Sequence, residues 1–193
     1  TRAASVDQLV VETLPRLERM LLHGTTTVEI KSGYGLTIED EMKQLDAIDR
    51  LAHETPARLV STFLGAHAVP AEYAGRVREY VDVVVHQMIP AVARRDTPPA
   101  FCDVFCEEGA FSVDESRRVL EAARARGMQP KIHVDEFKAL GGTRLAVELG
   151  ATSADHLVRT PPDEIELAPG KRDLPVVGHG HHPHLPRRDR VAM

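Results

Sequence analysis

Short apolar or β-branched segments alternate with amphipathic helical segments along this chain of 193 residues. Strands that are separated by helices run parallel, because each helical crossover returns the chain to the same edge of the sheet. The alternation therefore predicts an α/β fold with one parallel sheet and covering helices. After a leading helix we identify five strand-loop-helix units, with strands expected at 25–30, 58–64, 101–106, 129–134 and 152–155.

Capping patterns predict where the helices begin. Residues 5–8 and 112–115 each have the spacing of a capping box, in which two side chains satisfy each other's backbone N–H groups. Thr37 is a third expected cap. Between residues 72 and 95 we expect a helical region that is broken near Gly75 and again at Pro90, because proline lacks a backbone donor.

Polar residues follow the end of every expected strand. They are Lys31 and Tyr34, His67, Glu107 and Glu108, His133 and Glu136, and Asp155 and His156. The carboxyl ends of parallel strands meet at one rim, where α/β proteins bind their ligands. The pattern predicts a partial (β/α)8 TIM barrel with about five parallel strands and a site on that rim.

Composition limits the classes of partner. The chain is 42% hydrophobic and 27% charged, with a net charge of -5, so it has no basic field for nucleic acid or anionic lipid. No apolar run approaches the roughly 18 residues of a membrane span, and no signal peptide opens the sequence. Cys102 and Cys106 lie too far apart along one strand to bridge each other, and we interpret them as reduced core residues. We expect a cytoplasmic protein without nucleic-acid or membrane partners.

The composition and periodicity of the sequence change near residue 165. Residues 1–165 contain all the expected strands and helices, whereas residues 166–193 contain four prolines and four histidines without any helical or strand period. We therefore expect a barrel domain over 1–165 and a disordered tail over 166–193. The tail histidines, at 179, 181, 182 and 184, suggest a metal site, and a polar low-complexity end is the alternative.

Each rim residue also has a structural explanation when it is taken alone. His67 and His156 could be hydrogen-bonded structural histidines, and Tyr34 could simply pack. The carboxylates at 107–108 could lie on a solvated loop. Taken together, the rim residues favour the functional explanation over the structural one, because chance would rarely put histidine at the ends of three strands out of five. The set as a whole favours a site.

Five longer motifs carry a specific resemblance. They are TTTVEIKSGYGL at 25–36, TFLGAHAVP at 62–70, DVFCEEGAFS at 103–112, IHVDEF at 132–137 and SADHL at 153–157. In this order and at these spacings they closely resemble the imidazolonepropionases, a family of the amidohydrolase superfamily that acts in histidine degradation. The resemblance runs from Thr1 to about Ile165.

The resemblance implies a metal-dependent hydrolase that acts on a small-molecule substrate. The family opens the ring of 4-imidazolone-5-propanoate at a cyclic amide C–N bond and gives N-formimidoyl-L-glutamate, with one zinc or iron ion bound. By this resemblance, His133 corresponds to a metal ligand, and Glu136 and His156 correspond to catalytic residues. The positions that contact substrate are Tyr34, His67 and Glu136.

Parts of the family pattern have no counterpart in this sequence. The His-x-His pair of the first barrel strand, the arginine that follows it and the aspartate ligand of the eighth strand are not found. A whole barrel needs roughly 200 to 250 residues or more. A catalytic metal needs at least three protein ligands, and His133 supplies one. We expect an incomplete chain, lacking the first and last strands, that is inactive alone.

Two other readings stay open. Lys31 or Lys131 could be the nucleophile of a metal-free enzyme that works through a Schiff base in the barrel. Alternatively, the chain could be a non-catalytic fragment that forms homo-oligomers through unpaired edges of its sheet.

Overall fold

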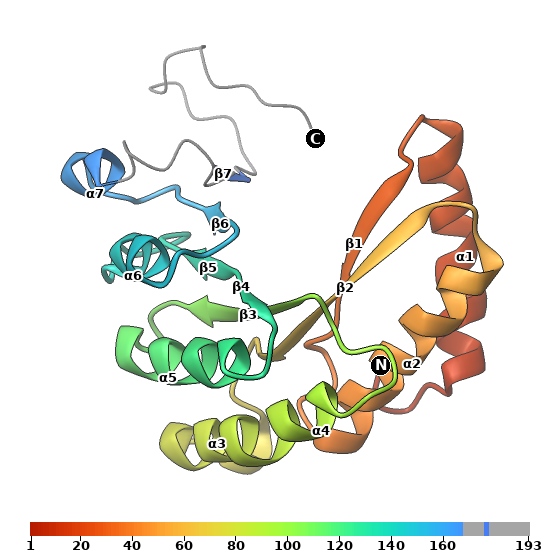
Figure 1. Cartoon of the computed structure of the whole chain (residues 1–193). Coiled ribbons are helices and arrows are strands. Elements are labelled where there is room, and N and C mark those ends of the chain that lie inside the picture. The colour runs from red at the N-terminus through yellow and green to blue at the C-terminus, as the bar shows by residue number, and fades with distance from the viewer. Residues whose placement is uncertain (168–175, 178–193) are drawn as a thin grey trace.

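One parallel sheet organises the protein, whose computed structural model describes residues 1–167 and 176–177 (Figure 1). Its strands are β1 (Thr27–Lys31), β2 (Arg58–Ala66), β3 (Phe101–Cys106), β4 (Gln129–Pro130), β5 (Ile132–Val134), β6 (Ala154–His156) and β7 (Val176–Val177). They lie in the order β1-β2-β3-β5-β6-β7, with β4 beside β3, and every pairing is parallel. Neighbours in sequence are neighbours in space, as in half of a TIM barrel. The predicted fold class is confirmed.

The expected strand 129–134 appears as two short strands. Gln129 pairs with Phe101 and His133 pairs with Phe105, so β4 and β5 keep the same register against β3. Between them the Lys131 N–H donates to the carbonyl of Cys102 at 2.8 Å. The segment is therefore continuous as a hydrogen-bonded strand, and β5 and β6 carry His133 and His156 to the carboxyl edge of the sheet.

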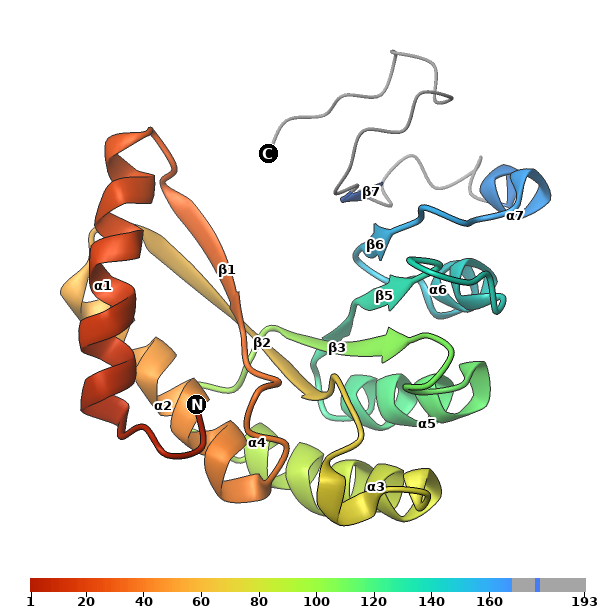
Figure 2. The same cartoon turned by 180° about the vertical axis from the view of Figure 1, so that it is seen from behind.

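The helices lie on one side of the sheet in both views (Figures 1 and 2). They are α1 (Val6–Leu22), α2 (Ile38–Glu54), α3 (Val77–Val83), α4 (Ile89–Ala93), α5 (Val113–Arg124), α6 (Gly142–Leu149) and α7 (Pro162–Glu166). The capping boxes at Ser5 and Ser112 are both formed, and the Thr37 hydroxyl accepts from the Asp40 N–H. The start points predicted for these three helices are confirmed.

The region between β2 and β3 differs from the expectation at Pro90. A 3-10 turn at Ala71–Tyr73 and α3 are separated near Gly75, as expected. Pro90, however, lies in the first turn of α4 and does not break the helix, because a π-helix at Val84–Met88 precedes it. Proline removes one N–H donor and crowds the preceding turn, and the wider π turn accommodates both effects.

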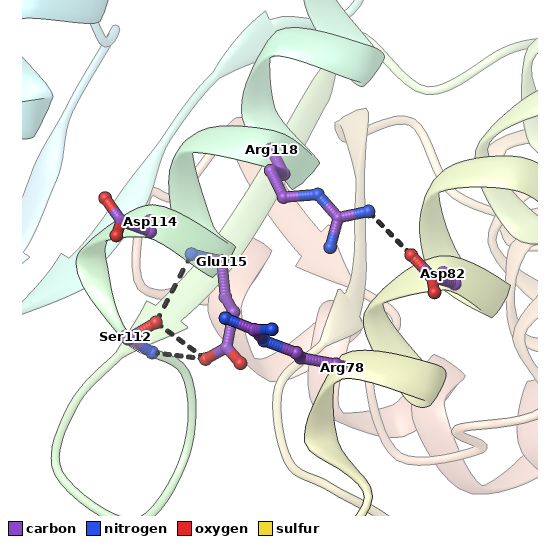
Figure 3. Close-up of a pocket in the computed structure, with 6 residues that line it drawn as sticks. All are labelled: Arg78, Asp82, Ser112, Asp114, Glu115 and Arg118. Atoms are coloured by element: carbon purple, nitrogen blue, oxygen red, sulfur yellow. Dashed lines mark hydrogen bonds and ion pairs between the residues drawn. The ribbon is translucent and has the colours of Figure 1, made fainter.

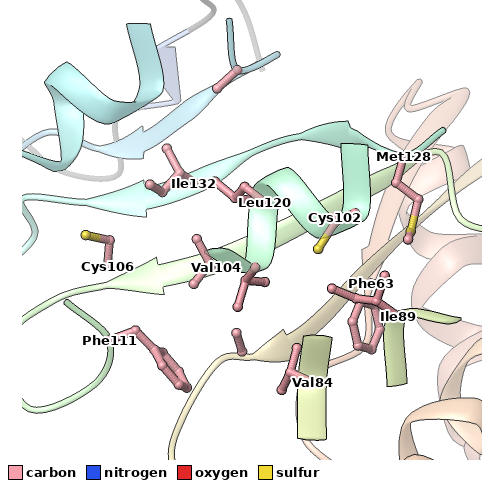
Figure 4. Packing of buried hydrophobic residues seen from close by; sticks show 14 of the residues in the cluster. Phe63, Val84, Ile89, Cys102, Val104, Cys106, Phe111, Leu120, Met128 and Ile132 are labelled. Carbon is pink, nitrogen blue, oxygen red and sulfur yellow. The ribbon is translucent and has the colours of Figure 1, made fainter. Parts of the chain in front are cut away.

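A hydrophobic core fills the space between the sheet and the helices. Figure 4 shows Phe63, Val104 and Ile132 of the strands packed with Leu120 of α5, and each of these side chains is buried. Cys102 and Cys106 are buried in the same cluster as free thiols, which confirms their prediction as reduced core residues. A smaller cluster joins α1, α2 and β1 through Val10, Leu17, Val28, Ala47 and Leu51.

The chain beyond α7 is largely outside the described residues. The expected tail begins at residue 166, and of it the structure describes 166–167 and β7, which pairs with β6. The four histidines at 179–184 lie outside the described residues. Within the part of the chain that the structure describes, none of the helices has the length and hydropathy needed to cross a bilayer.

Candidate active site

The face of the sheet opposite the helices is polar. Residues that alternate with the buried core positions of each strand carry charged or hydroxyl side chains, namely Glu29, Lys31, Thr62, Asp103, Lys131, His133 and Asp155. Successive side chains of a strand point to opposite faces, so one face packs against the helices and the other gathers these groups. In a TIM barrel the second face is the interior.

Ion pairs connect these groups across the sheet. Lys31 Nζ lies 2.8 Å from Glu29 Oε1, 2.8 Å from Asp103 Oδ2 and 3.8 Å from Asp155 Oδ2. Lys131 Nζ lies 2.6 Å from Glu29 Oε2. Charges that are removed from water persist only when they are paired and hydrogen-bonded, so this network holds β1, β3 and β6 in register across the sheet.

The ion-pair network argues against the hypothesis that Lys31 or Lys131 forms a Schiff base. Burial would lower the pKa of Lys31, but the charges and hydrogen bonds of Asp103 and Glu29 outweigh it, and the pKa of Lys31 is raised. A protonated amine is not a nucleophile. Lys131 also donates to a carboxylate, that of Glu29. Neither lysine therefore has the surroundings of an activated amine.

His133 is held between two carboxylates. Its Nδ1 lies 3.0 Å from Asp103 Oδ1 and its Nε2 lies 3.7 Å from Asp155 Oδ2. Burial lowers the pKa of His133, but the hydrogen bond and charge of Asp103 outweigh it, so the pKa is raised. Burial alone would raise the pKa of Asp103, whereas His133 and Lys31 hold it below its usual range.

Aromatic rings form a row along the carboxyl ends of the strands. The ring centroids of Tyr34 and His67 are 4.9 Å apart, and those of His133 and His156 are 5.2 Å apart. Phe105 connects the two pairs, with centroid distances of 6.2 Å to His67 and 6.4 Å to His133. Side chains from five strand ends, up to 122 residues apart in sequence, are thus brought side by side.

Glu136 extends this row at the β5 end, where its Oε2 lies 3.4 Å from His156 Nε2. The structure therefore brings together all five of the residues proposed from the sequence: Tyr34, His67, His133, Glu136 and His156. Of the other rim residues, Glu107 accepts from the N–H groups of Phe137 and Lys138 and so supports the Glu136 loop. Glu108 is exposed and pairs with Lys138.

The loops that carry Glu136 and His156 have a left-handed backbone. Asp135, His156 and Leu157 have φ angles of 54°, 77° and 54°. A non-glycine residue in this region costs about 1–3 kcal/mol and persists only where its surroundings hold it. Asp135 is fully buried, and its Oδ2 accepts from Thr143 Oγ1 at 2.6 Å and Thr160 Oγ1 at 2.8 Å. These bonds tie the two loops together.

A buried carboxylate anchors the Tyr34 loop. Glu41 of α2 has no exposed surface and accepts from the N–H groups of Gly33 at 2.8 Å, Gly35 at 2.9 Å and Leu36 at 2.8 Å. Gly33 has φ +105°, and a Cβ there would lie 2.7 Å from the carbonyl oxygen of Leu64. The Gly33 carbonyl in turn accepts from His67 Nδ1 at 2.9 Å. Glu41 thus positions both aromatic residues at this end of the row.

Replacing Glu41 by glutamine is expected to lower the free energy of unfolding by about 1–3 kcal/mol. One amide oxygen cannot accept the bonds that two carboxylate oxygens accept, and a buried N–H group of the loop is left unsatisfied. Chemical denaturation of the purified chain measures the loss. Glu39→Gln, at an exposed position in the same helical turn, is the control and should change stability by less than about 0.5 kcal/mol. Equal stability of the two variants would contradict the anchor.

Sequence reasoning missed Glu41 and Asp103 as parts of the site, and it missed the partners of Asp135. Asp103 had one signal, because an acid inside the apolar strand 101–106 needs a partner to be buried. Asp135 lies in the quoted motif at 132–137, but its threonine partners are 8 and 25 residues away. Glu41 looked like an ordinary acid in the first turn of a helix.

The side chains near His133 fit a cation in part. Asp103, His133 and Asp155 each offer a ligand atom, and these atoms lie within 4.8 Å of one another. Asp103 is already engaged by Lys31 and His133, whereas Asp155 Oδ1 is buried without a hydrogen-bond partner among the described residues. The Lys31 ammonium opposes a second positive charge here. His133 and Asp155 thus offer atoms that could serve as two ligands, whereas a catalytic metal needs three or more.

A hollow in the helix layer does not belong to this site. It has a volume of about 380 Å³ and lies between α3 and α5 (Figure 3). Arg78, Asp82, Ser112, Asp114, Glu115 and Arg118 line it. Arg118 pairs with Asp82 at 2.6 Å, and Ser112 and Glu115 cap each other. Four of its six lining residues are thus paired with one another, and none of the residues of the row takes part.

Comparisons with known proteins agree with the motifs. No family model matches the chain. Curated imidazolonepropionases match the chain. The imidazolonepropionase of Herpetosiphon aurantiacus is 56% identical over 173 residues, and the match covers 86% of this chain and 40% of that protein. The chain is a partial homologue of the imidazolonepropionases. The enzyme of Alkaliphilus oremlandii is 49% identical and that of Syntrophobacter fumaroxidans 57%, covering 91% and 82% of this chain.

The homology to imidazolonepropionases is confined to part of their length. The chain spans about 40% of the Herpetosiphon aurantiacus protein, 42% of the Alkaliphilus oremlandii protein and 37% of the Syntrophobacter fumaroxidans protein. Among solved structures, adenine deaminase from Arthrobacter aurescens matches with a TM-score of 0.60 and 17% identity, covering 84% of this chain and 49% of that one. At this identity the likeness shows the barrel fold alone.

Proposed function

We propose that the chain forms part of an imidazolonepropionase active site, which hydrolyses 4-imidazolone-5-propanoate to N-formimidoyl-L-glutamate in histidine degradation. One observation carries the proposal: Tyr34, His67, His133, Glu136 and His156 lie in a single row along the carboxyl ends of the strands. The homology to imidazolonepropionases supports it. The reaction class is hydrolysis of a cyclic amide C–N bond.

Zinc or iron would bind through His133 Nε2, with Asp155 on the same side of the ring. When bound, such an ion would supply Lewis acidity, which lowers the pKa of water toward neutral pH. An amide-like ring carbon resists attack by neutral water, so this step needs such help. The residues of the chain then have to orient the substrate and move protons.

Glu136 is placed to move those protons. The water oxygen bonds to the ring carbon, the C–N bond breaks, and the leaving ring nitrogen needs a proton. A carboxylate beside the attacking water can accept the first proton and deliver it to the nitrogen. His156 Nε2 lies 3.4 Å from Glu136 Oε2, and with both ring nitrogens protonated the imidazole would donate to this carboxylate and to the oxyanion that develops on the ring carbonyl.

Tyr34 and His67 bind the substrate at the other end of the row. Their rings meet edge to face at 4.9 Å, and the His67 Nδ1 donates to the Gly33 carbonyl. This bond fixes the plane of the imidazole and leaves Nε2 for the substrate. The Tyr34 hydroxyl can donate to the propionate tail, and His67 Nε2 can accept from an N–H group of the substrate ring. Tyr34 is 64% exposed, which leaves its ring accessible to a ligand.

A graft tests the proposal. Residues 1–165, which we propose as the domain, replace the matching part of the Herpetosiphon aurantiacus imidazolonepropionase, and the chimaera is assayed with 4-imidazolone-5-propanoate and added zinc or iron. We expect the chimaera to hydrolyse the substrate and the 193-residue chain to do so far more slowly, because its described residues supply two metal ligands. A folded, metal-loaded chimaera without turnover would refute the proposal.

A further inference from the structure

We infer that Asp103 is a positioning residue that selects the tautomer of His133. Asp103 is fully buried on β3, and both of its oxygens are engaged. Its Oδ1 accepts from His133 Nδ1 at 3.0 Å and from the Val104 N–H at 2.8 Å. Its Oδ2 accepts from Lys31 Nζ at 2.8 Å. The inference rests on the proposed role of His133 as a metal ligand.

The carboxylate determines which nitrogen of the ring carries the proton. A neutral imidazole has one N–H group, and an ionised carboxylate can only accept. The His133 proton therefore sits on Nδ1, and the lone pair is on Nε2. That nitrogen lies 3.7 Å from Asp155 Oδ2, so two electron-rich atoms face each other across a gap that a cation would fill. Partners of this kind orient metal-binding histidines and raise their affinity for metal.

Lys31 makes the inference testable, because it fixes which way a substituted amide must turn. An asparagine at 103 has one oxygen and one NH₂ group. The Lys31 ammonium and the Val104 N–H can both only donate, and they face different oxygens of Asp103. A bond from the ammonium is charge-assisted and about twice as strong as one from a neutral N–H, so the oxygen would face Lys31 and the NH₂ group would face His133 Nδ1. An NH₂ donor there requires a lone pair on Nδ1, which moves the ring proton to Nε2. The lone pair would then point away from the metal position.

The test is NMR of the full chain with ¹⁵N-labelled histidine, without metal and at a pH where the His133 ring is neutral. We expect the Nδ1–H tautomer in the wild type and the Nε2–H tautomer in Asp103→Asn. Zinc titration of the same samples should show a 10- to 100-fold higher dissociation constant for the variant. Asp82→Asn, which removes an exposed carboxylate paired with Arg118, is the control and should change neither readout.

The two possible failures are distinguishable. A wild-type His133 with its proton on Nε2 would overturn the inference, and this measurement does not need the variant to fold. A folded Asp103→Asn with the proton still on Nδ1 and an unchanged zinc dissociation constant would also overturn it. If zinc binds neither protein, the tautomers alone decide. Zinc binding that survives His133→Ala would instead refute the proposed metal role, whatever the tautomer.

Discussion

His133→Ala in the chimaera is expected to abolish stoichiometric metal binding and to bring turnover below detection. The reason is that His133 Nε2 is the imidazole nitrogen turned toward Asp155, on the side away from Asp103. Without the ion, the attacking water would keep the high pKa of bulk water. Metal content by mass spectrometry and a substrate-depletion assay measure the two effects.

A matched histidine separates this loss from a general effect of the substitution. His53 is exposed in the last turn of α2, and His53→Ala should keep both metal and activity. Stoichiometric metal together with full activity in His133→Ala would show that the ligand assignment is wrong.

Glu136→Gln is expected to lower kcat of the chimaera by about 10²–10⁴-fold while metal content is unchanged. Glutamine keeps the shape of the side chain, but its amide cannot take a proton from water or return it to a ring nitrogen. KM should change less than kcat, because the expected loss falls on proton transfer. Steady-state kinetics with metal analysis on the same sample measures all three quantities.

The control for Glu136 lies on the neighbouring rim loop. Glu108 has a side chain that is 65% exposed and pairs with Lys138 outside the row. Glu108→Gln should leave kcat within a factor of about two, since it is an exposed ion pair of small energetic worth. If Glu136→Gln and Glu108→Gln have the same kcat, Glu136 does not transfer protons in the rate-limiting step.

The fold was predictable because its signals are local. Alternating periods of hydrophobicity, capping boxes at residues 5–8 and 112–115 and polar strand ends each occupy a few consecutive residues. They determine parallel strands and one common rim without knowledge of any distant contact. The π-helix before Pro90 was not predictable in this way, because proline alone indicates a break and not the wider turn that accommodates it.

The residues of the row could be predicted from the sequence, but the residues that hold them in place could not. Strand ends identify Tyr34, His67 and His133, since topology places every strand end on the same rim. The groups that hold them depend on pairings across the fold: Asp103 meets Lys31 over 72 residues and His133 over 30. Sequence spacing carries no information about such pairs, and only a rule that buried acids need partners could have identified Asp103.

The left-handed backbone at Asp135 and His156 limits which substitutions evolution can accept at this rim. Glycine would relax both turns at little conformational expense, yet at 135 it would remove the acceptor of Thr143 and Thr160 and at 156 it would remove the imidazole itself. At 135 the buried hydrogen bonds that glycine would lose favour aspartate for stability, whereas at 156 selection for stability and selection for turnover favour different residues. Thermostabilised descendants that must remain active should acquire their substitutions in the helix layer.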